Sequence, residues 1–195
     1  MQTTHPQQTI ARRLVPATAL NTALLVVGFA LLTALAAQIR FPVPGSPIPI
    51  TGQTFAVLLS GAVLGSRAGA GSQVVYWLMG AFGLPVFAQA SGGWEAATGA
   101  TFGYLLGFVV AAWAVGSLAE RGTDRSVRSA VPSFLGGNLL IYAIGIPWLL
   151  YSVPSIETLS GALAAGFTPF IVGDVIKIAL AGVSLPAAWK LAGKH

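Results

Sequence analysis

Long apolar runs alternate with short polar segments along most of this chain. A membrane-spanning helix needs about 20 mostly apolar residues, and six stretches meet or approach that length, at about residues 19–38, 53–66, 68–84, 99–119, 129–151 and 167–191. The second stretch is short, because at about 1.5 Å per residue it extends only about 21 Å. It must extend back toward Ile48 or be shielded by neighbouring helices. The pattern predicts an all-α integral membrane protein with six transmembrane helices.

The first apolar run resembles an export signal, because Arg12 and Arg13 precede it and residues 34–37 resemble a cleavage site. The run is longer than the core of a signal peptide, which is typically about 7–15 residues. We therefore expect a retained first helix. The chain is predicted to form one six-helix membrane domain over residues 1–195, with residues 1–18 as a cytoplasmic N-terminal segment.

Basic residues fall mainly on one side of this six-span arrangement. Arg40 is the exception on the other side, and Lys177 lies inside the sixth span. Because cytoplasmic loops of membrane proteins are enriched in Lys and Arg, this distribution predicts that both termini are cytoplasmic. The residues on the predicted cytoplasmic side are Arg12, Arg13, Arg67, Arg121, Arg125, Arg128, Lys190 and Lys194.

The composition excludes several functional classes. Hydrophobic residues make up 55% of the chain and charged residues 8%, about a third of the charged fraction of a soluble domain. The formal charge of +5 comes from too few residues to track a nucleic-acid backbone. The chain has no Cys, and its two His residues, His5 and His195, lie near its ends. No nucleotide-binding or hydrolase motif occurs, so the sequence predicts neither an enzyme nor a metal site.

Two charged residues within the sixth span are the strongest candidates for a binding site. Asp174 and Lys177 are three residues apart and so share a helix face. Each would cost about 2.5–3.5 kcal/mol at the centre of a bilayer, so both should face the bundle interior or a cavity. They form either a structural ion pair or part of a ligand site. Asn138 and Tyr104 are further polar candidates at membrane depth.

The predicted outer loops contain additional candidates. Residues 40–52 carry four prolines, which favour a stiff, extended chain, and this loop is either a semi-rigid flap or a plain connector. Phe87 and Trp94 in the next outer loop could form an apolar wall. In the first span, Ala30 and Ala34 belong to a stripe of small residues that either packs inside the bundle or contacts a partner.

Four segments in order resemble the BioY family, the biotin-specific substrate-capture (S) components of energy-coupling-factor (ECF) vitamin transporters. They are TGQTFAVLLSGAVLGSR at 51–67, GLPVFA at 83–88, TFGYLLGF at 101–108 and FIVGDVIK at 170–177. The resemblance implies six helices with cytoplasmic termini in a prokaryotic cell membrane, and biotin bound on the outer side. It also implies a transmembrane scaffold subunit and two ATP-binding-cassette ATPases as partners. An Ala-x-x-x-Ala motif on the first helix would contact the scaffold, and Ala30 and Ala34 match that motif.

Under this resemblance, biotin is a transported ligand and no cofactor is implied. Asp174 would accept a hydrogen bond from the ureido ring, and Gln89 or Asn138 would bind the same ring. Lys177 would neutralise Asp174 or reach the ligand carboxylate. The apolar body of biotin would be buried by Tyr104, Phe87 and Trp94.

Three alternatives stay open at this point. The chain could capture a different vitamin, because the scaffold would be shared and the pocket would select the ligand. It could be a small proton-coupled transporter that uses Asp174 as the proton carrier, or a membrane subunit that binds no small molecule. Membrane lipid surrounds the chain in every case, and a homo-oligomer stays open.

Overall fold

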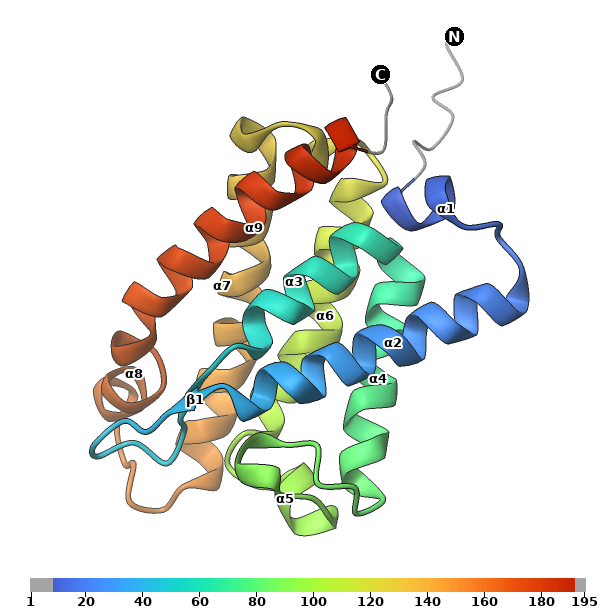
Figure 1. Ribbon diagram of the computed structural model, residues 1–195. Coiled ribbons are helices and arrows are strands. Elements are labelled where there is room, and N and C mark those ends of the chain that lie inside the picture. The colour runs from blue at the N-terminus through green and yellow to red at the C-terminus, as the bar shows by residue number, and fades with distance from the viewer. Residues whose placement is uncertain (1–8, 192–195) are drawn as a thin grey trace, which may run out of the picture.

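The computed structural model describes residues 9–191, which fold as a bundle of helices with one short two-stranded ribbon (Figure 1). His5, Lys194 and His195 lie outside the described residues, as do residues 1–8 of the predicted N-terminal segment. The long helices are α2 (Ala19–Gln38), α3 (Gln53–Leu64), α4 (Ser66–Ala81), α6 (Phe102–Ala119), α7 (Val127–Ser152) and α9 (Ile171–Leu191).

Shorter elements connect these helices at the two ends of the bundle. The strands β1 and β2 pair antiparallel, with Arg40 opposite Thr51. We call the end with β1, β2, α5 and α8 the ribbon end, and the end with α1 and the last turn of α9 the terminal end (Figure 1). The short elements are α1 (Ile10–Leu14), β1 (Arg40–Phe41), β2 (Ile50–Thr51), α5 (Trp94–Thr98), α8 (Leu159–Gly166) and the 3-10 turns η1 (Ala88–Ala90), η2 (Thr123–Arg125) and η3 (Thr168–Phe170).

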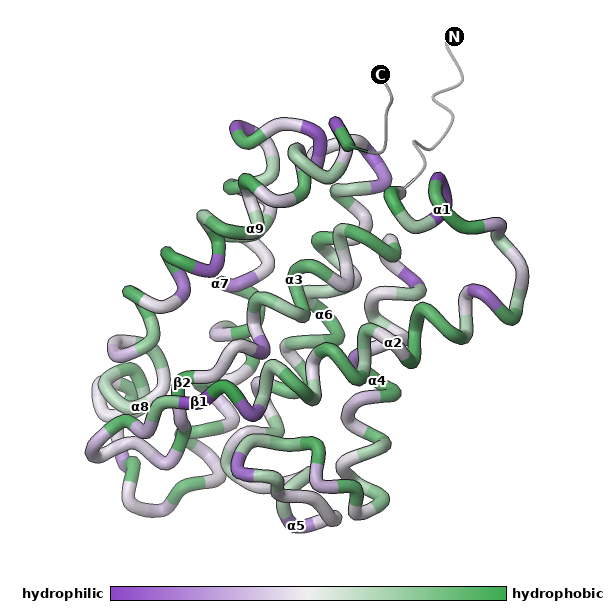
Figure 2. Tube along the Cα trace, viewed as in Figure 1, coloured by the Kyte–Doolittle hydropathy of each residue, from purple (hydrophilic) through white to green (hydrophobic). Residues whose placement is uncertain are grey.

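Each predicted apolar stretch overlaps one long helix, and the predicted all-α membrane class is confirmed. Four helical stretches in the described chain are long and apolar enough to cross a membrane: α2, α6, α7 and the stretch Leu159–Leu191 that includes α9. The helices α3 and α4 are shorter, with 12 and 16 residues. They meet at Gly65, whose φ of 88° breaks the helical path between them. Figure 2 shows hydrophobic residues along the helices and polar residues concentrated toward the connections.

Helix α6 lies at the centre of the bundle and packs against α3, α4 and α7. Close approach depends on small residues: a Cβ added at Gly61 of α3 would lie 2.4 Å from the Ala112 carbonyl oxygen of α6. Backbones that approach this closely gain dispersion energy, which is a main source of helix association in lipid. The short helix α3 is therefore enclosed by its neighbours, and Val57, Leu58 and Ala62 are buried.

Helix α2 is attached to the bundle by one face. Its Thr33 is completely buried and exchanges hydrogen bonds with Gln73 of α4, whose Nε2 also donates to Ser60 Oγ of α3 at 3.0 Å. The opposite face exposes large apolar side chains such as Leu24, at 62%. Such a face suits contact with lipid or with another membrane helix.

The predicted partner-contact residues, Ala30 and Ala34, lie on the inner face of α2. Ala30 is completely buried and Ala34 is 8% exposed, because both pack into the hydrophobic core. A spacing of four residues marks a helix face, but it does not say whether that face meets the same chain or another one. A second Ala-x-x-x-Ala pair, Ala19 and Ala23, lies about three turns nearer the helix start and is exposed.

Candidate functional site

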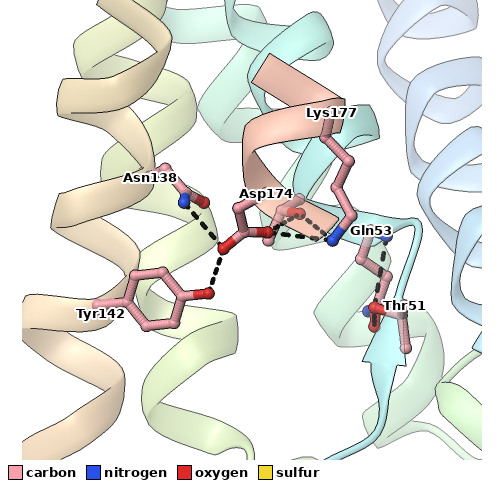
Figure 3. A network of polar contacts seen from close by, with 7 residues as sticks. Thr51, Gln53, Asn138, Tyr142, Asp174 and Lys177 are labelled. Carbon is pink, nitrogen blue, oxygen red and sulfur yellow. Dashed lines mark hydrogen bonds and ion pairs between the residues drawn. The ribbon is translucent and has the colours of Figure 1, made fainter. Parts of the chain in front are cut away.

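An ion pair at the start of α9 forms the centre of the candidate site (Figure 3). Asp174 is 4% exposed, and its Oδ1 lies 3.1 Å from Lys177 Nζ, one helical turn further on. Lys177 Nζ also donates to Thr54 Oγ1 of α3 at 3.0 Å. Because Asp174 lies in the first turn of α9, the helix dipole further favours its negative charge.

Helix α7 supplies the other partners of Asp174. Asn138 Nδ2 donates to Asp174 Oδ2 at 3.0 Å, and the Tyr142 hydroxyl donates to the same oxygen. Asn138 and Tyr142 are four residues apart and so project from the same side of the helix. A buried carboxylate with a cation and several donors is satisfied, whereas the loss of one charged partner would leave an uncompensated charge.

These residues border a cavity at the ribbon end of the bundle. The cavity has an enclosed volume of about 70 Å³, and the empty space reaches about 640 Å³ when the open solvent at its mouth is included. One polar group of the lining consists of Asp174, Lys177 and Thr54. The apolar and aromatic lining includes Ile48, Pro49, Tyr76, Phe87, Tyr104, Leu105, Phe108, Ile141, Tyr142 and Phe170.

A second polar chain closes the cavity from the side of α3 and α4. Thr51 Oγ1 donates to Gln53 Oε1, and Gln53 Nε2 donates to the Tyr76 hydroxyl, each at 2.8 Å. The Tyr76 hydroxyl in turn donates to the Val86 carbonyl at 3.2 Å. This chain connects β2, α3 and α4 to residues 83–93, which we call the capping loop.

Aromatic rings form the apolar walls of the cavity. Phe87 meets Tyr76 edge to face with ring centroids 5.5 Å apart, and Tyr104 meets Tyr142 in the same way at 6.2 Å. The Tyr104 hydroxyl donates to the Gly166 carbonyl at 3.0 Å, which links α6 to the end of α8. Edge-to-face pairs hold these rings in defined orientations.

Four of the predicted site residues line the cavity: Asp174, Lys177, Tyr104 and Phe87. Asn138 lies behind the lining, where it contacts Asp174. Within the described chain, Asn138 Oδ1 is buried and has no hydrogen-bond partner. The structure therefore brings five of the seven predicted residues together.

Gln89 and Trp94 are placed away from the cavity. Gln89 is an exposed residue of η1 with a φ of 66°, and it is not among the lining residues. Trp94 is 66% exposed and packs against Trp77, with ring centroids 6.0 Å apart. Both residues are close to Phe87 in sequence, but their side chains do not reach the cavity, because the loop turns away between Phe87 and α5.

Sequence reasoning missed Tyr142, Thr54 and Gln53 as members of the site. A signal existed for Tyr142, because it follows the candidate Asn138 by four residues within an apolar span. For Thr54 no signal was available, since its contact with Lys177 joins residues 123 positions apart. Across the described residues, no group of three or more His, Cys, Asp or Glu side chains could hold a metal ion.

The fold and the site define a class: a helical membrane protein with a cavity that is lined by aromatic and aliphatic residues and carries a buried ion pair. Comparison with known proteins identifies the family. The BioY family profile matches residues 7–194, so the chain belongs to the BioY family. This confirms the resemblance predicted from the four sequence segments, and it places the chain among transport proteins and not among enzymes.

Several relatives carry names that describe biotin transport. The biotin transporter BioY of Thermotoga maritima is 40% identical, over 83% of this chain and 87% of its own length. The probable biotin transporter BioY of Pyrococcus horikoshii is 40% identical over 80% and 89%. The biotin transporter BioY of Rhodobacter capsulatus is 35% identical over 84% and 90%.

A solved structure shares the fold. The crystal structure of the S-component for biotin from an ECF-type ABC transporter superposes with a TM-score of 0.78. It covers 90% of this chain and 94% of that chain, at 22% sequence identity. The helical arrangement described above is therefore that of a known membrane fold.

Proposed function

We propose that this chain binds biotin in the cavity and takes it up as the substrate-specific subunit of an ECF-type transporter. The observation that carries this proposal is the Asp174–Lys177 pair, 3.1 Å apart, in a cavity whose other walls are largely aromatic and aliphatic. Biotin combines a polar ureido ring with an apolar thiophane and chain. The names of the relatives support the same ligand.

The ureido ring has two N–H donors and one carbonyl, which suit the groups around Asp174. Asp174 accepts one N–H of the ureido ring. Asn138 donates to the same carboxylate through Nδ2, and its Oδ1, buried without a partner among the described residues, is the acceptor proposed for the other N–H. Lys177 neutralises Asp174, since its ammonium already contacts Oδ1. A neutral pair avoids the cost of holding an unpaired charge at membrane depth. Phe87 and Tyr104 cover the apolar body of the ligand.

The orientation proposed for the bundle in the membrane follows from the charged residues at its two ends. The terminal end presents exposed cations, among them Arg67, Arg121 and Lys190, whereas the ribbon end carries Arg40 together with Glu95 and Glu157. The positive-inside rule supports cytoplasmic termini, six crossings and a cavity that opens outward at the ribbon end. The chain then forms one membrane domain in a prokaryotic cell membrane.

The proposed energy source for transport is a set of partner subunits, in keeping with the lack of a nucleotide-binding motif in the sequence. The partners proposed are a transmembrane scaffold and two ATP-binding-cassette ATPases. If an Ala-x-x-x-Ala pair on the first helix contacts the scaffold, the accessible pair is Ala19 and Ala23 in place of Ala30 and Ala34. The exposed apolar face of α2 continues the same surface.

The test is equilibrium binding of biotin to the purified, detergent-solubilised protein, measured by calorimetry with desthiobiotin and thiamine as competitors. Nanomolar to low micromolar binding that desthiobiotin displaces and thiamine does not is the expected result. Displacement by thiamine would indicate a different vitamin. No binding by folded, ligand-free protein would reject the proposal, and uptake driven by a pH gradient in vesicles without ATPases would then support a proton-coupled transporter.

A further inference from the structure

The last residue of α2 contacts the capping loop through both ends of its side-chain amide. Gln38 Nε2 donates to the Phe87 carbonyl at 3.0 Å and to the Val86 carbonyl at 3.5 Å. Gln38 Oε1 accepts from the Ala90 backbone N–H at 3.2 Å. One side chain therefore bonds three backbone groups of the loop. Figure 1 shows the end of α2 beside this loop.

The segment of the loop that Gln38 holds has an unfavourable backbone conformation. Gln89 and Ala90 have φ values of 66° and 53°. Residues other than Gly, Asn and Asp seldom adopt this left-handed region. Such a conformation persists where surrounding contacts impose it. The bond from Ala90 N–H to Gln38 Oε1 is one of these contacts, and it acts on the second of the two residues.

The same segment places Phe87 against the cavity. The Phe87 ring is 6% exposed, lines the cavity and packs on Tyr76. Its own carbonyl is the acceptor at 3.0 Å from Gln38 Nε2. A change at Gln38 therefore acts directly on the backbone of the residue whose ring closes one wall.

The end of α2 also bonds a second segment that borders the cavity. The Gly52 N–H donates to the Ala36 and Ile39 carbonyls, each at 3.1 Å. Gly52 lies between Thr51 and Gln53, both of which line the cavity. One helix end is thus bonded to two segments that line the cavity.

We propose that Gln38 is a positioning residue that holds the capping loop closed over the ligand and thereby sets the rate at which the ligand leaves. Gln38 does not line the cavity, so it acts through Phe87. This inference rests on the proposed function for the identity of the ligand. The structural link between Gln38 and the loop does not depend on it.

The test compares Gln38→Met with the parent and with Gln89→Met. Methionine keeps the length of the side chain but removes both hydrogen-bonding groups. Gln89 is the matched control, because it lies on the same loop with an exposed side chain outside the cavity. Dissociation of labelled biotin after a chase with excess unlabelled biotin should be about tenfold faster in Gln38→Met, corresponding to about 1.4 kcal/mol. The association rate and melting temperature should change little.

A double variant separates positioning from a general loss of structure. In a Phe87→Ala background, Gln38→Met should produce no further increase in the dissociation rate, since the ring through which it acts is gone. An unchanged dissociation rate in the single variant would overturn the proposal. So would an equal effect of Gln89→Met, or an effect of Gln38→Met that persists without Phe87.

Hydrogen–deuterium exchange of the ligand-free protein tests the same link without any ligand. Amide exchange in residues 86–91 should be faster in Gln38→Met than in the parent and unchanged by Gln89→Met. If the parent fails to bind biotin, the proposed function fails, but this exchange experiment still decides whether Gln38 holds the loop. Unchanged exchange in Gln38→Met would overturn the proposal in either case.

Discussion

The ring of Phe87 occupies the space beside Gly80 that a side chain on residue 80 would need. A Cβ added at Gly80 would lie 2.1 Å from Phe87 Cζ, and two more ring atoms would lie within 2.5 Å. The Gly80 carbonyl also accepts bonds from the N–H groups of Gly83 and Gly93, at the two ends of the capping loop. The absence of a side chain at residue 80 therefore allows the loop and the cavity wall to take these positions.

Gly80→Ala should weaken biotin binding by forcing Phe87 out of its position. A contact of 2.1 Å cannot be accommodated, so the ring and the loop must move. We expect a loss of at least tenfold in affinity by calorimetry. Gly71→Ala is the matched control on the same helix, because a Cβ there meets nothing within 4 Å. It should leave binding unchanged and raise stability slightly, since Ala exceeds Gly in helix propensity by about 1 kcal/mol. Equal binding by both variants would contradict the role of Phe87.

Asp174→Asn should weaken biotin binding by more than tenfold. Removing one partner of a desolvated, charged hydrogen bond typically costs about 2–5 kcal/mol, and this change also leaves Lys177 without its anion. The matched control is Asp124→Asn, which makes the same change at a buried carboxylate in η2, at the terminal end. Its affinity should match that of the parent. Should folded Asp174→Asn bind as well as the parent, the site assignment is wrong.

Tyr142→Phe should reduce stability more than it reduces binding. The hydroxyl donates to Asp174 Oδ2, and the loss of a bond to a buried charged group costs about 1.5–3 kcal/mol. In a chain of this size each kcal/mol lowers Tm by about 2–4 °C. The ring itself stays in the cavity wall. Tyr151→Phe, whose side chain is 82% exposed, should melt like the parent, and a parent-like Tm for Tyr142→Phe would contradict the importance of this bond.

The sequence predicted the membrane class and the location of all six long helices, because a run of apolar residues is a local property. The pairing of Asp174 with Lys177 was also accessible, since three residues along a helix fix their relative position. Asn138 could be proposed because an amide in an apolar span needs a partner. These successes share a cause: each depends on spacing within one element.

The sequence is least informative where the direction of a side chain depends on tertiary structure. Ala30 and Ala34 share a face, but the Thr33–Gln73 contact turns that face inward. Gln89 and Trp94 lie close to Phe87 in sequence, but the positive φ values at residues 89 and 90 change the path of the loop. Spacing rules for helices do not apply to such a segment, so its side chains could not be assigned from the sequence.

Ala30→Leu and Ala23→Leu should have opposite consequences, which distinguishes the two faces of α2. Ala30 is completely buried, and overpacking a core typically costs about 1–3 kcal/mol, so Ala30→Leu should lower Tm. Ala23 is exposed, and its variant should melt and bind biotin like the parent. When co-expressed with the scaffold and ATPases, Ala23→Leu should copurify less with them. If Ala30→Leu instead keeps the Tm of the parent but no longer copurifies with the scaffold and ATPases, Ala30 and Ala34 are the scaffold-contact pair.

Asp124 should make the stability of the protein depend on pH, and the sign follows from its surroundings. Its side chain is 2% exposed, and burial raises the pKa of this carboxyl above its usual range. The Trp189 Nε1–H, which donates to Oδ2 at 2.6 Å, and the Arg125 guanidinium oppose that shift without cancelling it. Asp124 Oδ1 has no hydrogen-bond partner among residues 9–191. The folded state therefore holds the proton more tightly than the unfolded chain does.

Between the usual and the raised pKa, the folded state binds more protons, so the contribution of Asp124 to stability falls as the pH rises. At pH 7 the ionised carboxylate costs stability, and Asp124→Asn should melt at a higher temperature than the parent. The Asn carbonyl still accepts the Trp189 N–H. As the pH is lowered through the raised pKa, the parent becomes protonated and the difference in Tm should shrink. Thermal unfolding of both proteins in detergent across this range measures it, and a difference that grows on acidification would show that the ionised form is the favoured one.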